Sequence, residues 1–139
     1  MYVFTRTAGH QALAEELGAA WVGRAEDTPP HPPDCSVIFA PAGALVPEAL
    51  RVLDKGGTVA CAGIHMSAIP TMPYELLYHE RTLCSVANST LEDVGELLSL
   101  AAQIGIETEV SLFPLAEANR ALQIVKDSTI SGAAVLLPR

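Results

Sequence analysis

Short apolar runs rich in β-branched and aromatic residues recur along the chain and alternate with segments of helical periodicity. Before residue 90 we expect strands over residues 2–5, 37–39, 58–62 and 82–87. Helices are expected over residues 10–17 and 46–53, and in the second of these the apolar side chains keep i, i+3, i+4 and i+7 spacing. Nearly continuous apolar strands joined by helices are typical of parallel sheets. The pattern therefore predicts an α/β fold.

The connections between these elements are rich in glycine and proline. Gly18 is expected to end the first helix in a left-handed conformation. Residues 21–22 form a short apolar stop, and the Pro-rich residues 23–33 that follow are expected to be a surface loop. Pro70 and Pro73 indicate a further loop before the strand at residues 82–87.

The pattern changes after residue 88. Thr90 and Asp93 are spaced as a capping pair for a helix, which Gly105 is expected to end. A strand over residues 108–112, an amphipathic helix over residues 115–127 and a last strand over residues 133–137 should follow. The character of the sequence therefore differs on the two sides of residues 88–90.

Composition and charge narrow the class of partner. Half of the 139 residues are hydrophobic and only 17% are charged, which excludes a disordered chain. The net charge of −8 would repel nucleic acid and anionic membranes, so neither is an expected partner. A signal peptide and an 18-residue apolar stretch are both lacking in the sequence, which favours a cytoplasmic location. Cys35, Cys61 and Cys84 show no metal-binding spacing and are expected to be buried structural thiols.

Candidate ligand contacts follow from one rule about open parallel sheets: ligands bind at the carboxyl ends of the strands. The rule selects four short segments, residues 6–7, 40–43, 63–65 and 86–88. Arg6 stands where doubly wound dinucleotide folds contact the adenosine ribose, and its guanidinium could bind a 2′-phosphate; it could equally be a solvated surface charge. Gly63 and Gly43 would let a flat ring approach the backbone, or would serve only as turn residues.

Other polar and aromatic side chains give weaker signals. His65 and His79 have no His or carboxylate at metal-site spacing, so structural or solvent roles are expected. Tyr74 is expected to pack. The sequence contains no Walker loop, no Gly-x-Ser-x-Gly elbow and no Gly-x-Gly-x-x-Gly fingerprint.

An ordered series of short motifs resembles the zinc-type alcohol dehydrogenases of the medium-chain dehydrogenase/reductase superfamily. The series comprises Val3-Phe4-Thr5-Arg6, Leu13-Ala14-Glu15-Glu16-Leu17-Gly18-Ala19, Lys55-Gly56-Gly57-Thr58-Val59, Ala62-Gly63-Ile64-His65, Ile69-Pro70, Pro73-Tyr74, Glu80-Arg81, Ser85-Val86-Ala87-Asn88, Pro114-Leu115-Ala116-Glu117-Ala118-Asn119-Arg120-Ala121-Leu122 and Gly132-Ala133-Ala134-Val135-Leu136. It covers nearly the whole chain in the family's order. Leu91 departs from the pattern, which has a basic residue there.

The resemblance implies that residues 1–88 form a partial dinucleotide-binding domain. This would be a doubly wound, Rossmann-like parallel sheet that lacks its first strand, and residues 89–139 would be an α+β segment returning to the catalytic domain. The resemblance also implies that the cofactor touches Arg6, Ala40, Gly63, Ile64, Val86, Ala87 and Asn88. The family's glycine fingerprint and zinc ligands have no counterpart in this sequence, so neither catalytic nor metal-binding residues are expected here.

The function implied is that of a fragment of an NAD(P)-dependent alcohol dehydrogenase, inactive alone. Arg6 favours NADP over NAD. The intact enzyme would act on a small alcohol or aldehyde, and this chain would be a homo-oligomer or would need a missing N-terminal part. Two other interpretations stay open: a non-catalytic nucleotide-binding or oligomerising module, and an unrelated flavodoxin-like or receiver-like α/β domain.

Overall fold

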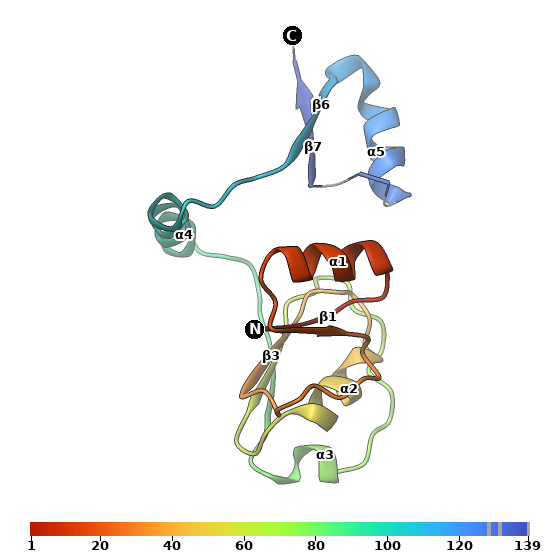
Figure 1. The fold of residues 1–139 in the computed structure, drawn as a ribbon, viewed down its shortest axis with the longest axis vertical. Helices are drawn as coiled ribbons and strands as arrows, with labels where there is room; N and C mark the ends of the chain where they lie inside the picture. The colour runs from red at the N-terminus through yellow and green to blue at the C-terminus, as the bar shows by residue number, and fades with distance from the viewer. Residues whose placement is uncertain (128, 131, 139) are drawn as a thin grey trace. The chain divides into compact units, whose positions relative to one another are not determined.

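The computed structural model describes residues 1–127, 129–130 and 132–138. The chain divides into two compact units, Met1–Asn88 and Ser89–Arg139, which Figure 1 shows in red to green and in green to blue. No helix among the described residues is long and apolar enough to cross a membrane.

Strands and helices alternate along the first unit, except that β3 follows β2 with no helix between them. Its elements are β1 (Tyr2–Phe4), α1 (Ala8–Glu16), β2 (Trp21–Gly23), β3 (Cys35–Ile38), α2 (Leu45–Val52), β4 (Thr58–Cys61), α3 (Glu75–Tyr78) and β5 (Thr82–Ser85). β1 pairs with β2, and β4 lies between β3 and β5; all three pairings are parallel. This is the parallel α/β arrangement that the sequence predicts.

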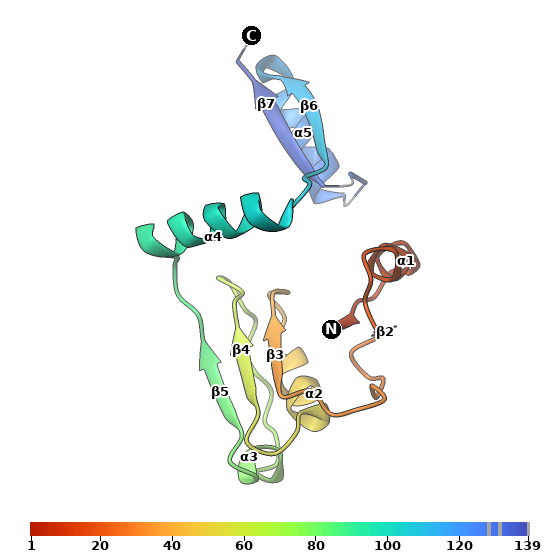
Figure 2. The same ribbon diagram turned by 60° about the vertical axis from the view of Figure 1, so that its left-hand side comes forward.

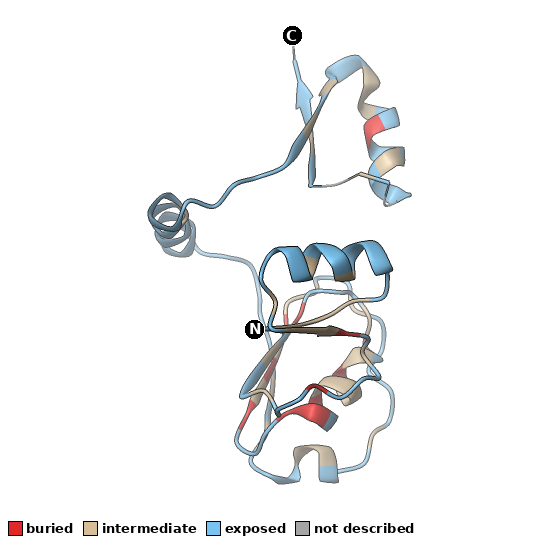
Figure 3. Cartoon of the chain, in the orientation of Figure 1, coloured by how far each residue is buried: buried red, intermediate tan, exposed pale blue. Residues whose placement is uncertain are grey.

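The core of the first unit lies between α2 and the three-stranded sheet. α2 places Val46, Leu50 and the following Leu53 against Val59 of β4, and all four side chains are fully buried. The i, i+3, i+4, i+7 spacing thus produces one continuous apolar face. Figure 3 shows the buried positions concentrated on α2 and on the strands beside it. By contrast, α1 has no buried residue.

The opposite face of the three-stranded sheet is open. Alternate strand residues point to opposite faces, and the core helices cover only the face of Ile38 and Cys61. Cys35 and Cys84 lie on the other face and are exposed, as is Val37 at 52%. The expectation that all three cysteines are buried is therefore wrong for Cys35 and Cys84 and right only for Cys61.

Two elements of the first unit were not expected from the sequence. Residues 21–22, interpreted as an apolar stop, and Gly23, expected to begin the loop, form β2, in register with β1 so that Tyr2 pairs with Trp21. The Trp21 ring also meets the Phe4 ring edge-on at a centroid distance of 5.1 Å. The short helix α3 lies in the segment expected to be a loop and begins two residues after Pro73.

β1 and β3 each have one edge without a strand partner. Among the described residues, β1 is hydrogen-bonded only to β2, and β3 only to β4. Figure 2 shows the β1–β2 pair beyond the β3 side of the three-stranded sheet, so the sheet is interrupted between them. A doubly wound sheet in the order 3-2-1-4-5-6 has its first strand at this point. The predicted fold class, an α/β sheet of this kind without its first strand, is confirmed.

The second unit begins with a helix whose two ends were predicted. Thr90 and Asp93 form a reciprocal capping box at the start of α4 (Leu91–Ile104), and Gly105 ends it with a φ of 66°. The rest of the unit is β6 (Val110–Pro114), a 3-10 turn η1 (Leu115–Glu117), α5 (Ala118–Lys126) and β7 (Ala133–Leu137). β6 and β7 pair in parallel, and Ala121 of α5 is buried.

Candidate functional site

The carboxyl ends of β3, β4 and β5 lie side by side at one edge of the sheet. Ile38, Cys61 and Ser85 stand in register across the three strands. The ladder continues one residue further, because the Ala62 amide donates to the Ile38 carbonyl and the Val86 amide donates to the Cys61 carbonyl, both at 2.9 Å. The loops that carry the predicted cofactor contacts of the three strands therefore start from a common edge.

Three of the predicted residues line one hollow at this edge. Gly63, Ile64 and Val86 contribute to an open cavity of about 400 Å³. The other lining residues are Cys61, Met66, Ile69, Leu83, Cys84 and Ser85. Ile64 is 83% exposed and Val86 57% exposed, so the hollow presents apolar side chains to solvent. A concave apolar surface beside accessible backbone is suited to a flat, partly polar ring.

Ala40 lies next to this hollow through its contact with Gly63. A Cβ atom on Gly63 would stand 3.0 Å from the Met66 side chain, 3.4 Å from Pro41 Cα and 3.5 Å from the Ala40 carbonyl oxygen. The loops after β3 and β4 therefore touch at Gly63. The structure thus brings together Ala40, Gly63, Ile64 and Val86.

The space beside Gly43 is filled by backbone atoms of the protein. A Cβ atom at this position would collide with the carbonyl oxygens of Ser67 and Ala68, and Gly43 is buried beneath them. Its amide donates to Ser67 Oγ at 2.9 Å. The absence of a side chain is therefore required for one loop to approach another, and Gly43 offers no surface to a ligand ring.

Arg6, Ala87 and Asn88 lie outside the hollow. Arg6 is exposed after β1, in the sheet that β1 forms with β2, and no hydrogen bond or ion pair of its side chain is present in the described structure. The next residue, Thr7, caps α1 by accepting from the His10 amide at 3.3 Å. Ala87 and Asn88 follow Val86 as exposed residues. A cofactor role for all seven predicted residues, inside the hollow or outside it, stays a prediction.

The remaining candidate side chains do not form a reactive group. Over residues 1–127, 129–130 and 132–138, no three His, Cys, Asp or Glu side chains are grouped so that they could hold a metal ion. Tyr74 and His79 each meet the ring of Tyr78 edge-on, with centroids 6.0 and 5.2 Å apart. Burial, with a smaller contribution from Cys84, raises the pKa of the Cys61 thiol, which disfavours its thiolate.

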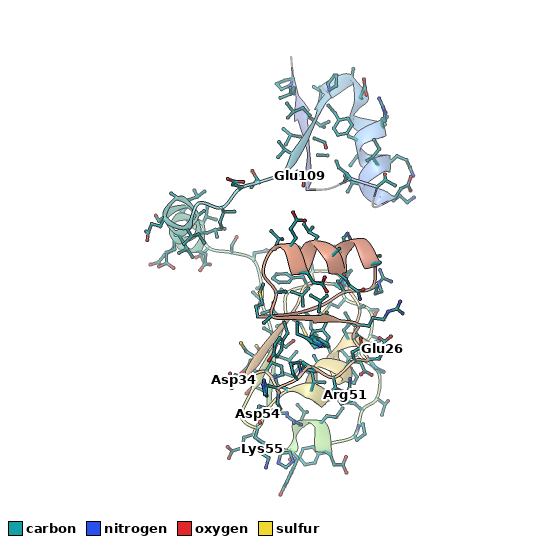
Figure 4. The ribbon with its side chains drawn as sticks, viewed as in Figure 1. Glu26, Asp34, Arg51, Asp54, Lys55 and Glu109 are labelled. Atoms are coloured by element: carbon teal, nitrogen blue, oxygen red, sulfur yellow. The ribbon has the colours of Figure 1, made fainter. Side chains whose placement is uncertain are left out.

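Two arginines, to which the sequence assigned no structural role, tie together elements of the first unit. Arg81 donates to the carbonyls of Leu53, at 2.6 Å, and Leu76, at 3.2 Å, which ties the end of α2 to α3. Arg51 pairs with Glu48 and donates to the Glu26 carbonyl at 2.9 Å, so it fastens the Pro-rich loop to α2; Figure 4 labels Arg51 and Glu26. Of these contacts, only the ion pair between Arg51 and Glu48 could be predicted from the sequence, because the two residues are three apart on one helix.

The parallel sheet with helices between its strands places the chain in the α/β class of folds, whose ligands bind at the carboxyl ends of the strands. No family model matches the chain. The chain is 44% identical over 138 residues to the probable alcohol dehydrogenase AdhA of Mycobacterium tuberculosis (strain CDC 1551 / Oshkosh), a match that covers 99% of this chain and 40% of that protein.

Solved structures show the same fold. The alcohol dehydrogenase of Aeropyrum pernix superposes with a TM-score of 0.82 at 22% identity, over 99% of this chain and 42% of that chain. The Helicobacter pylori protein CAD, solved in complex with NADP(H), gives a TM-score of 0.76 at 14% identity, over 97% of this chain and 40% of that chain. The predicted resemblance to part of a medium-chain alcohol dehydrogenase is confirmed, and the chain spans about 40% of the length of the AdhA relative.

Proposed function

We propose that this chain supplies part of the nicotinamide-binding sheet of an alcohol dehydrogenase. The observation that carries the proposal is the 44% identity to AdhA, which extends over 99% of the chain. In the complete enzyme, hydride would pass between a small alcohol or aldehyde and the nicotinamide ring of the bound cofactor. Residues 1–88 would form the partial cofactor domain, and residues 89–139 would return to the catalytic domain.

The proposed cofactor path follows the edge where β3, β4 and β5 end. Gly63, Ile64 and Val86 would contact the flat ring through their shared hollow, which supports a fit to nicotinamide. Ala40 would lie beside them, and Ala87 and Asn88 would continue the path from β5. The role of these residues is to bind and orient the cofactor, since none of them carries a group suited to proton transfer.

We propose NADP in preference to NAD because of Arg6. Its guanidinium is exposed after β1, where it is free to bind a 2′-phosphate in a forked, charge-assisted contact. Replacement of Arg6 by Ala in the complete enzyme should raise the Kd for NADPH by about ten-fold or more. The Kd for NADH should change little.

Zinc chemistry, if the complete enzyme uses it, lies outside the role that we propose for this chain. The described residues contain no group that fits zinc, so we assign this chain no step that involves the metal. If the complete enzyme uses zinc, its ligands must come from polypeptide other than these residues. The chain would then contribute cofactor binding and no catalytic residue.

We propose that the chain alone has no turnover. The edges of β1 and β3 lack the strand that would join them, and that strand leads into the helix N-terminus which holds the pyrophosphate in such folds. Unpaired edges also invite association, so a homo-oligomer is the alternative to completion by an N-terminal part. We place the protein in the cytoplasm, without nucleic acid or membrane partners.

Complementation tests the function directly. The chain is combined with the portion of AdhA that it does not match, and oxidation of a short alcohol is followed through formation of reduced nicotinamide. We expect turnover from the mixture and none from either polypeptide separately. A non-catalytic nucleotide-binding module, which the open edges would also suit, predicts cofactor binding by the chain and no turnover from the mixture.

A further inference from the structure

The loop after β4 is clasped to the loop after β3 by two hydrogen bonds around Ser67. The Gly43 amide donates to Ser67 Oγ at 2.9 Å, and the Ser67 amide donates to the Pro41 carbonyl at 3.2 Å. Gly43 lacks a Cβ at the position where the carbonyl oxygens of Ser67 and Ala68 approach it. The two loops therefore meet at a distance that only glycine allows.

The clasp lies within the two segments that carry the proposed cofactor contacts. Ala40 is three residues before Gly43 in the first loop, and Ile64 is three residues before Ser67 in the second. Met66, in the second loop between Ile64 and Ser67, packs against the buried core cluster. Its side chain would be 3.0 Å from a Cβ atom on Gly63. Met66 thus anchors the second loop to the core, while Ser67 fixes it to the first loop.

Ser67 holds the two loops together by accepting the hydrogen bond of the Gly43 amide. Gly43 is buried, and its amide has the Ser67 hydroxyl as its partner. A buried amide without an acceptor is unfavourable, so loss of the hydroxyl should drive the loops to rearrange. Ser67 itself is exposed, so its removal leaves the core intact.

We propose that Ser67 is a positioning residue for the nicotinamide cofactor, acting through the Gly43 clasp on Ala40, Gly63 and Ile64. This inference rests on the proposed function, and it adds a residue with no direct cofactor contact to the binding site. Because the hydroxyl orders the binding surface and takes no part in hydride transfer, its loss should weaken cofactor binding and leave the chemical step unchanged.

The test uses the complex of this chain with the complementing portion of AdhA. Ser67→Ala should raise the Kd and KM for NADPH about three- to ten-fold, the range of one net hydrogen bond, with kcat at saturating cofactor within about two-fold of the parent. Ser67→Thr, which keeps the hydroxyl, should return the KM to within about two-fold of the parent. Ser99→Ala, in α4, removes a hydroxyl bonded only to its own helix and is the matched control.

The position of the clasp is checked in the same complex by amide hydrogen exchange. The Gly43 amide should exchange faster in Ser67→Ala than in the parent and in Ser67→Thr. An unchanged cofactor KM in Ser67→Ala overturns the inference while the proposed function stands. If the parent complex binds neither NADPH nor NADH, the proposed function fails and the inference fails with it.

Discussion

At the scale of single residues, glycines at strand ends serve different purposes that the sequence does not separate. Gly43 and Gly63 both follow a strand and both could admit a ligand ring. Gly63 lines the hollow, whereas the space beside Gly43 is filled by the backbone of Ser67 and Ala68, 24 and 25 residues further along the chain. That difference depends on a contact between loops distant in sequence, so local pattern could not predict it.

Because backbone fills the space beside Gly43, we expect one added methyl group there to destabilise the fold. Gly43→Ala should lower the free energy of unfolding by about 1–3 kcal/mol, because the new Cβ overlaps backbone carbonyl oxygens that cannot move independently. Gly95→Ala is the control: it lies within α4 with nothing near its Cβ, and should stabilise by about 0.5–1 kcal/mol. Urea unfolding of both variants measures this, and equal effects would contradict the packing described here.

Arg81 gives a second prediction at the residue scale. Arg81→Ala should lower the free energy of unfolding by about 1–3 kcal/mol, because the carbonyls of Leu53 and Leu76 lose a charged donor in a partly buried position. Arg120→Ala removes an arginine whose ion pair with Glu117 is exposed, and should cost about 0–1 kcal/mol. Thermal melts compare the two, and a larger loss from Arg120→Ala would refute the assignment.

At the scale of elements, periodicity predicts the long segments and misses two short ones, β2 and α3. The strand at residues 133–137 and the helix starting after Thr90 were placed closely, since each has a clear apolar pattern or cap. β2 has three residues, too few to show a period, and it is a strand because it pairs with β1. α3 has four residues after two prolines, which favoured a loop.

The capping box of α4 makes a pH prediction at this scale. Hydrogen bonds from the Thr90 amide and hydroxyl lower the pKa of Asp93 below its ordinary value. The ionised carboxylate therefore stabilises the helix start fully above the unfolded pKa of about 3.9, and this contribution is lost as the pH falls through the folded value. Carboxyl NMR titration should show the pKa of Asp93 rising in Thr90→Ala; no change would argue against the cap.

At the scale of the whole molecule, the sequence predicted the fold class and the interruption of the sheet. It did so through the ordered motifs, which place these strands after a first strand that joins the two halves. The strands themselves show why that strand matters: β1 and β3 each leave one edge unpaired among the described residues. The candidate cofactor contacts could be selected from the sequence as a group at strand ends. That Gly63, Ile64 and Val86 line one hollow with Ala40 beside it, while Arg6 follows a strand of another pair, required the structure.

We propose that the chain supplies part of a cofactor-binding sheet and needs a complementing polypeptide to bind the cofactor. The most direct test is a thermal melt of the chain with NADPH, repeated with the unmatched portion of AdhA present. We expect no shift from NADPH with the chain alone and a shift in the mixture, of about 2.7 kcal/mol in stability when NADPH is at about a hundred times its Kd. A full shift with the chain alone, or none in the mixture, would contradict the account.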